Sequence, residues 1–370
     1  MPILPRISGI REYFHRTKQP FSPARRTGEK GSMNTYQYDN PLLNEEARSF
    51  DRQIVERVAH GHVPDLRHTG RCDYFYNNVW RDPYFADLLF GETVRQICRY
   101  ARQYLSKPSS ACRVLEIACG PGHLSLELAR NAFPVTGIDI SRECIRTAQI
   151  TAAADPYKNN RGALDFICMD IDCFIPEQPF DMIVFSNALH HFGDVDRILV
   201  KISSFLSNDG LLYVSEPAKE PLSDSDAMII HLIRTLLSLS GCYFEKQPVP
   251  ENQIALGEIL KKIKSEFEYK DESRNNVQSP MDNQAPFSQT YPVLKKYFTE
   301  LAFQNDFSFF DRMIGGLRFE NREQEHALAK WLYLLDRQLC GQGALAAEQY
   351  HFVGRKKPKI PMETKTENRS

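Results

Sequence analysis

Apolar and polar positions alternate along residues 112–216 in a pattern that predicts five strands separated by helices. Short apolar runs recur between longer amphipathic stretches, which is the spacing of βαβ units. The continuously apolar run at 180–186 is typical of a strand buried on both faces of a parallel sheet. Each crossover should then be right-handed. The expected strands are 114–117, 133–141, 164–169, 180–186 and 211–216, with helices over 142–154 and 194–206 and a turn at 208–210.

Outside this stretch the pattern is mainly helical. Before it, a helix is expected to bury Phe50, Ile54, Val55 and Val58 on one face. After the fifth strand the predicted elements are helices at 225–240 and 251–269, a polar loop at 270–290, a helix at 291–302, a strand at 307–313, a helix at 322–339 and a last strand at 349–356. The parts are therefore a basic tail (1–32), a helical cap (33–110), an α/β core (111–216), a helical lid (217–290), the end of the core (291–357) and a tail (358–370).

Composition narrows the possible classes of protein. The chain is 42% hydrophobic and 25% charged with a formal net charge of −1, so no global field would attract nucleic acid. The nine cysteines are odd in number and include no Cys-x-x-Cys pair, which argues against a zinc site or a disulfide framework and favours a reducing cytoplasm. The most apolar stretch, 227–239, is too short for a membrane span.

The first 32 residues differ from the rest. They hold seven Lys/Arg against two Glu, a pattern shared by organelle transit peptides. The alternative, which we prefer, is an extension without a fold that precedes a native start at Met33.

The most informative chemistry follows the first strand. Glu116 lies in this strand, and a Gly120-Pro121-Gly122 turn leads into a helix. Glycines there let a ligand lie against the main chain at a helix N-terminus. The turn lacks the Gly-Lys-Ser/Thr ending of a P-loop, and Ser125 stands where a dinucleotide fingerprint needs a third glycine or alanine. An acid in the strand instead fits a ligand with a cationic amino group.

On residues 116–122 the chain resembles the class I S-adenosylmethionine (SAM) dependent methyltransferases. Glu116 corresponds to the acid of their first motif, and Ala118, Gly120 and Gly122 correspond to its three small positions, with alanine a mild departure from the usual glycine. The alternative is an unrelated buried strand, turn and helix. The resemblance implies an α/β fold: a doubly wound, mostly parallel seven-stranded sheet, Rossmann-like, with a helical cap and helical insertions after strands 5 and 6.

The resemblance also implies positions for the cofactor. Glu116 and the backbone of Ala118, Cys119, Gly120 and Gly122 would hold its methionine end, and Asn187 would border the methyl group. An acid that ends the second strand can accept both ribose hydroxyls, which assigns Asp139 with its neighbour Ile140, although NAD enzymes use the same device. Adenine is assigned to Asp170 and Ile171, with Asp172 an alternative acid. Ser141 should cap the helix that follows.

Methyl transfer requires alignment of acceptor, methyl and sulfur rather than a metal ion. A protonated acceptor also needs a base, and His190 or His191 stands directly after the fourth strand, where an acceptor would lie. The alternative is that both histidines only pack. His123 is expected near the cofactor carboxylate. Aromatic residues of the N-terminal part would either close the cleft or pack: Tyr36, Tyr38, Tyr74, Tyr76 and Trp80.

The sequence therefore predicts a cytoplasmic SAM-dependent methyltransferase that acts on oxygen or nitrogen of a small, partly apolar or aromatic molecule. A SAM-binding regulator without catalysis is the alternative, and the missing third glycine argues against an NAD enzyme. Nucleic acid is not an expected partner, because Ser186-Asn187-Ala188-Leu189 stands where an Asn-Pro-Pro-Tyr motif would. Neither the acceptor nor the oligomeric state follows from these patterns.

Overall fold

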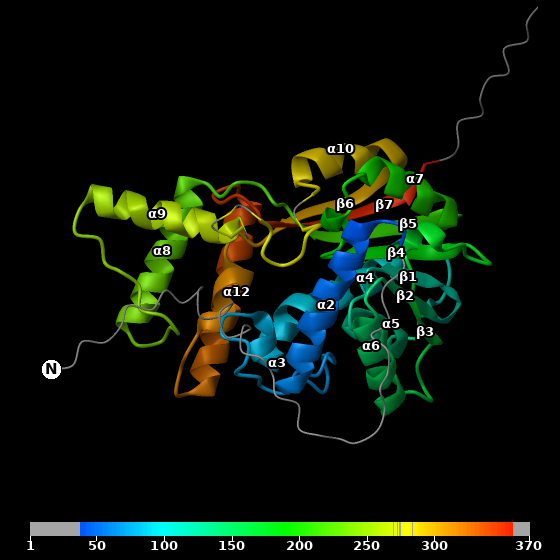
Figure 1. Cartoon of the computed structure of the whole chain (residues 1–370), viewed down its shortest axis with the longest axis horizontal. Helices are drawn as coiled ribbons and strands as arrows, with labels where there is room; N and C mark the ends of the chain where they lie inside the picture. Colours follow the sequence, from blue (N-terminus) through cyan, green and yellow to red (C-terminus); the bar gives the residue numbers. More distant parts are fainter. Residues whose placement is uncertain (1–37, 269, 272, 274, 283, 358–370) are drawn as a thin grey trace, which may run out of the picture. The chain divides into compact units, whose positions relative to one another are not determined.

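The computed structural model describes residues 38–268, 270–271, 273, 275–282 and 284–357, and every structural statement below concerns these residues. The two expected tails and Tyr36 lie outside them. Seven strands form one sheet in the order β3-β2-β1-β4-β5-β7-β6 (Figure 1). Neighbours among β1 to β5 pair in parallel, and β7 is antiparallel to both β5 and β6. The strands are β1 Val114–Ile117, β2 Val135–Asp139, β3 Leu164–Cys168, β4 Phe180–Ser186, β5 Leu206–Pro217, β6 Phe298–Asp306 and β7 Gln349–Lys356.

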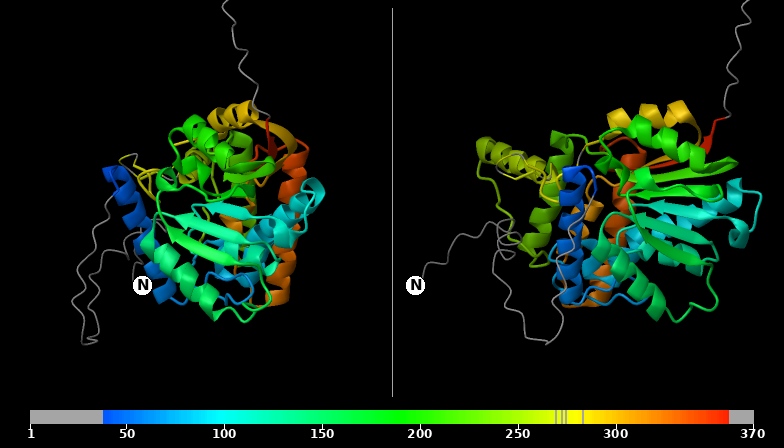
Figure 2. Two further views of the ribbon diagram at one scale, coloured as in Figure 1. Left: turned by 90° about the vertical axis from the view of Figure 1, so that its right-hand side faces the viewer. Right: turned by 45° about the vertical axis from the view of Figure 1, so that its right-hand side comes forward.

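Helices cover both faces of the sheet (Figures 1 and 2). α7 (Val195–Phe205) and α10 (Phe287–Tyr297) share one core cluster with β1, β4 and β5, whereas α4 (Glu92–Tyr104) and α5 (His123–Arg130) share another with the opposite side chains of the same strands. α6 (Arg142–Ala154) packs against β2 and β3. The doubly wound α/β fold is therefore confirmed.

Local sequence explains where these helices begin. Ser141 accepts a hydrogen bond from the Cys144 N–H at the start of α6, which confirms the expected cap. Asp194 caps α7 in the same way through the Arg197 N–H. The turn expected at 208–210 is wrong: these residues continue β5, and the excess length is absorbed by a register shift against β4 between Phe180 and Met182.

The N-terminal part contains α2 (Pro41–Ala59), η2 (Val79–Arg81), α3 (Pro83–Ala86), η3 (Asp87–Gly91), α4 and η4 (Ser109–Ala111). The expected buried face of α2 is wrong in part, because Val55 and Val58 are 50% and 43% exposed. Its buried residues are Glu46, Ala47, Ser49 and Ile54. Glu46 and Ser49 lie on the buried face because they hydrogen-bond to a distant loop, so hydrophobic periodicity alone identified only part of that face.

The insertion after β5 contains α8 (Asp224–Leu239) and α9 (Gln253–Phe267), and the insertion after β6 contains α11 (Phe310–Met313), η7 (Ile314–Gly316) and α12 (Arg322–Gly341). These helices share a third hydrophobic cluster with the 72–90 segment, which includes Phe75, Phe85, Ile230 and Phe309. Within the described ranges, no helix is both long and apolar enough to cross a membrane.

The predicted helix at 291–302 is correct up to Tyr297 and wrong beyond it, and the predicted strand at 307–313 is wrong. The helix stops at Tyr297 and β6 starts at Phe298, because residues 298–306 pair along β7. The apolar run at 307–310 turns into α11 instead, since the Asp336 carboxylate of α12 accepts hydrogen bonds from three successive backbone N–H groups, of Ser308, Phe309 and Phe310. Tertiary hydrogen bonding thus overrides a sequence that locally favours other elements.

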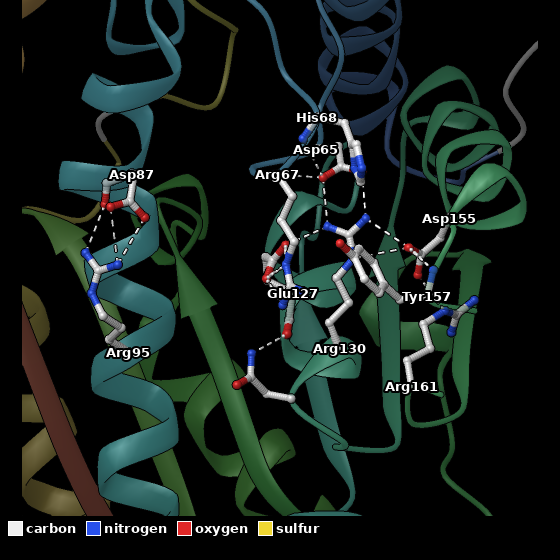
Figure 3. Close-up of polar contacts among 11 residues, drawn as sticks. Asp65, Arg67, His68, Asp87, Arg95, Glu127, Arg130, Asp155, Tyr157 and Arg161 are labelled. Atoms are coloured by element: carbon white, nitrogen blue, oxygen red, sulfur yellow. Dashed lines mark hydrogen bonds and ion pairs between the residues drawn. The ribbon is translucent and has the colours of Figure 1, made fainter. Parts of the chain in front are cut away.

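A cluster of ion pairs holds the N-terminal part onto the core. Figure 3 shows Arg130 of α5 between two carboxylates, with Asp65 at 2.7 Å and Asp155 at 3.0 Å. Glu127 contacts the same guanidinium at 2.6 Å and also pairs with Arg67. The Arg130 side chain is 1% exposed. We call these five residues the Arg130 clasp, which links the loop after α2 to α5 and to the end of α6.

Candidate functional site

The loop from β1 to α5 contains three residues with left-handed backbone. Ala118, Gly120 and Gly122 have φ of 55°, 53° and 78°, a region that is costly for a residue with a side chain. At Gly122 a Cβ would lie 2.6 Å from Phe166 and 2.7 Å from Ala148, so this glycine lets the loop pack on β3 and α6. At Gly120 a Cβ would meet no atom within 4 Å. Gly120 is therefore the position at which the main chain faces open space.

Cys119, between these residues, points the other way. Its thiol is buried, and burial raises its pKa well above the ordinary value. Its N–H donates to the Ile138 carbonyl at 3.0 Å, which ties the loop to β2. Cys119 is thus an anchor of the loop rather than a side chain open to a ligand.

Glu116 lies under the loop and is 3% exposed. Its carboxylate accepts a short hydrogen bond from the Ser125 hydroxyl of α5. Burial raises the pKa of Glu116 to about 8 despite that bond. Ser125, which stands where a dinucleotide fingerprint has glycine or alanine, supplies the hydrogen bond to this buried carboxylate. A cation nearby would favour the ionised carboxylate.

Asp139 ends β2 and holds the loop from the other side. One carboxylate oxygen accepts from the Gly120 N–H and the other from the Ser141 N–H, both at 2.8 Å. Burial raises the pKa of Asp139 to about 6, against the opposing effect of these bonds. The next residue, Ile140, accepts a hydrogen bond from the Tyr38 hydroxyl at 3.0 Å. A hydrogen bond therefore links Asp139 directly to Gly120, where the main chain faces open space.

The two alternative acids after β3 have different surroundings. Asp172 is paired with Arg197 at 2.5 Å on the surface. Asp170 is half-buried, caps η5 (Ile171–Cys173) through the Asp172 N–H, and has a pKa raised by burial. Ile171 is buried in the core that contains Ile117 and Ile138. Asp170 is the acid of the two that is not committed to an arginine.

The turn after β4 is shaped by Glu216 of β5. Asn187 is exposed and has a φ of 51°, and its N–H donates to the Ser215 carbonyl. The Ala188 and Leu189 N–H groups donate to Glu216 at 2.7 and 2.8 Å. This buried carboxylate thereby fixes the short helix η6 (Leu189–His191), which contains both histidines.

His190 is enclosed between two carboxylates. Its Nδ1 lies 2.6 Å from Glu216 and its Nε2 lies 3.4 Å from Asp282, which also pairs with Lys219 at 3.1 Å. Burial alone would lower the pKa of His190, but the bonds to Asp282 and Glu216 outweigh it and raise the pKa. Both nitrogens are engaged, so His190 is poorly placed to accept a further proton.

His191 differs from His190 in the hydrogen bonding of its ring nitrogens and in the direction of its pKa shift. Its Nδ1 lies 2.9 Å from Glu46 of α2, and its ring packs edge-on against Phe50. Its Nε2 has no hydrogen-bond partner among the described residues and is not a buried atom. Burial and the neighbouring His190 lower the pKa of His191, which favours the neutral ring. It has the environment of a base.

The expected aromatic residues go to separate places. Trp80 packs on Phe90 and, edge-on at 5.1 Å, on His123 at the start of α5. Burial lowers the pKa of His123 to about 4. Tyr74 stacks on His60, and Tyr76 is exposed beside Phe244. Only Trp80 approaches the glycine loop, and it does so by packing.

Three acids at this site had no assigned role in the sequence: Glu46, Glu216 and Asp282. Glu216 could have been found, because it ends a strand at the same sheet edge as Asp139. Glu46 and Asp282 gave no such signal, since they come from distant segments. Two surface hollows, of about 520 Å³ beside Pro179 and about 410 Å³ between α8 and the end of α12, are lined by other residues.

Comparison with known proteins gives a consistent family. The model of a methyltransferase domain matches residues 108–299, a little over half of the chain. The mitochondrial ubiquinone biosynthesis O-methyltransferase of Bos taurus is 28% identical over 207 residues, covering 55% of this chain and 48% of that protein. The corresponding protein of Xylella fastidiosa is 34% identical over 116 residues, 30% of this chain and 45% of that one.

The chain thus spans about half the length of the curated relatives it matches. Among solved structures, the plantazolicin methyltransferase BpumL in complex with SAH is 16% identical and covers 84% of this chain and 99% of that chain, with a TM-score of 0.39.

Proposed function

Because the chain belongs to the methyltransferase domain family, we propose that it transfers the methyl group of SAM to an oxygen or nitrogen atom of a small molecule. The observation that carries this proposal is the joined pair of Gly120 and Asp139. An open stretch of main chain is fixed there to an acid at the carboxyl ends of β1 and β2. Ligands of open α/β sheets bind at this edge.

The residues present fit SAM. Glu116 is a buried carboxylate that a cationic amino group would keep ionised, and Gly120 leaves room for a ligand beside the main chain. Asp139 would accept the ribose hydroxyls next to Ile140. Asp170 and Ile171 would receive adenine, and Asn187 would border the methyl group. Cys119 and Ala118 would contribute backbone only.

Bound SAM would supply a methyl group on a sulfonium leaving group. The protein then has to align the acceptor and exclude water. We assign the general base to His191 and not to His190, because His191 has an accessible Nε2 and a lowered pKa. His190, held by Glu216 and Asp282, would keep η6 in place.

The acceptor class is also a proposal. The relatives named above are O-methyltransferases of ubiquinone biosynthesis, which favours an oxygen acceptor on a partly apolar, aromatic molecule. The insertion at 217–290 would act as the lid over this acceptor. All nine cysteines are free thiols, which suits a reducing compartment such as the cytoplasm.

The first experiment is calorimetric titration of the full chain with SAM. We expect micromolar binding that Asp139→Ala weakens at least tenfold, because the loop loses its anchor and the ribose its acceptor. Asp172→Ala is the matched control, since its carboxylate is paired with Arg197 on the surface, and it should bind as wild type.

Absence of SAM binding, or binding of NAD instead, would refute the proposal. SAM binding without release of S-adenosylhomocysteine across a panel of phenolic and amine acceptors would favour the non-catalytic regulator.

A further inference from the structure

Glu46 joins three segments that are far apart in the sequence. It is buried on α2, and one carboxylate oxygen lies 2.9 Å from His191 Nδ1. The same oxygen accepts a hydrogen bond from the Ser279 hydroxyl at 2.7 Å. The other accepts from the Met281 N–H at 2.8 Å. The acid is therefore held by the loop at 278–282 while it contacts the histidine.

That loop is fastened to α2 at a second point. The Ser49 and Gln53 side chains donate to the Gln278 carbonyl at 3.0 and 2.9 Å. Further along, the Gln284 N–H donates to the His190 carbonyl at 2.9 Å. The loop consequently bridges α2 and η6, and its contacts with both occur where Glu46 meets His191.

The contact determines which ring nitrogen of His191 carries the proton. A carboxylate can only accept, so the Nδ1 that faces Glu46 must donate a proton to it. In a neutral ring the lone pair then lies on Nε2. This Nε2 is the nitrogen without a partner among the described residues. The geometry is the one in which an acid orients a histidine base.

We propose that Glu46 is the positioning residue for His191, and that docking of the loop at 278–282 on α2 assembles this base. The inference rests on the proposed function, since it assigns a use to the bare Nε2. It adds a coupling: the lid insertion has to be seated on the N-terminal helix before His191 is aligned. Methyl transfer would then be restricted to the state in which the lid is docked.

The charged groups that face His191 are Glu46 of α2, His190 of its own helix and Asp282 of the loop. His190 and Asp282 are themselves engaged with Glu216 and Lys219. Glu46 is thus the carboxylate in direct contact with the His191 ring, and removal of Glu46 should change His191 without removing the other pairs.

The test measures the His191 tautomer by long-range ¹H–¹⁵N imidazole NMR on the full chain labelled at histidine, with the signal assigned through His191→Gln. Wild type should show the Nδ1–H tautomer almost exclusively. Glu46→Ala should convert about a third or more of the population to Nε2–H. Glu45→Ala, the same change at the neighbouring exposed acid, is the matched control and should leave the signal unchanged.

Two further variants keep the test interpretable if Glu46→Ala folds poorly. Glu46→Gln preserves shape but removes the charge that favours the protonated ring, and should lower the measured pKa of His191. Ser49→Ala with Gln53→Ala leaves Glu46 intact, and should still raise the Nε2–H population, because the loop loses its fastening. Nε2–H in wild type, or an unchanged signal in Glu46→Ala, overturns the role of Glu46. An unchanged signal in the double variant overturns the role of the loop.

The readout needs neither cofactor nor acceptor. A failure of SAM to bind the wild type would therefore refute the proposed function while the tautomer result stands on its own.

Discussion

Burial raises the pKa of single acidic residues at the carboxyl edge of the sheet. Glu116 is the clearest case, because its carboxylate is buried and hydrogen-bonds to Ser125 of α5. The sequence indicated an acid at this place but not its burial, which depends on α5 covering β1. In the same way the His190-His191 pair was visible in the sequence, whereas the difference between the two rings follows from Glu46 and Asp282, which only the fold brings to them.

We expect the burial of Glu116 to make stability fall with rising pH. The folded pKa of about 8 lies above the unfolded value of about 4.3, so the folded state keeps a proton that the unfolded state has lost between these values. Stability contributed by this group is thus complete below pH 4 and is lost as pH rises toward 8, by about 3 kcal/mol between pH 5.5 and pH 8.

Urea denaturation at pH 5.5 and pH 8 measures this effect. Glu116→Gln, which cannot ionise, should lose clearly less stability over the same interval. Equal losses in wild type and variant would show that Glu116 does not titrate in this range.

At the scale of elements, the sequence predicts best where local and tertiary preferences agree. The helix at 142–154 and the strand at 349–356 match the structure at both ends, since a serine cap defines the one and a buried apolar run the other. The region 291–313 fails because β6 is an edge strand with a mixed burial pattern, and because Asp336 bends the run that follows. No feature within that region predicts that β6 pairs with β7 or that Asp336 binds the backbone at 308–310.

The Arg130 clasp yields the prediction at this scale. Arg130→Ala should destabilise the protein by about 3–5 kcal/mol, because it leaves Asp65, Glu127 and Asp155 buried without their shared cation. Arg146→Ala is the control, since this exposed arginine makes only a surface pair with Glu143 and its loss should cost under about 1 kcal/mol. Chemical denaturation distinguishes the two, and similar costs would contradict a role for the clasp.

The Arg130 clasp should also affect how the stability of the protein depends on pH under acidic conditions. Burial would raise the pKa of Asp65, but its bonds with Arg130 and Arg67 hold the pKa at about 2. A depressed carboxyl pKa stabilises above the unfolded value and loses that contribution as pH falls from about 4 to 2. Wild type should lose more stability than Arg130→Ala in this window.

On the scale of the whole described chain, the insertions after β5 and β6 and the N-terminal part are not independent additions. Residues of the 72–90 segment, α8, α9, α11 and α12 contribute to one hydrophobic cluster. The sequence separated a cap from a lid because composition shows only where segments begin and end. Segments that share a core can be separated by more than a hundred residues in the sequence. No local sequence pattern indicates such contacts.

Truncation of Ile230 tests whether the shared core behaves as one unit. Ile230 of α8 is fully buried, and Ile230→Ala should cost about 2–5 kcal/mol. Hydrogen exchange should then accelerate both in α8 and in the segment 75–90, as expected for a cooperative unit. Ile150→Ala on α6, where the side chain is 58% exposed, is the matched control. Faster exchange confined to α8 would show that the two parts open separately.

The order of strands has a consequence for synthesis on the ribosome. Among the seven described strands, β7 lies between β5 and β6, so β5 and β6 do not pair with each other, and both pair with a strand that is translated after them. Until residue 356 has emerged from the exit tunnel, one side of β5 is an unpaired edge, which is a template for pairing with other chains. Both insertions are translated during that interval. The nascent chain therefore exposes an unpaired strand edge that can pair with other chains, and this exposure ends only when β7 pairs with β5 and β6.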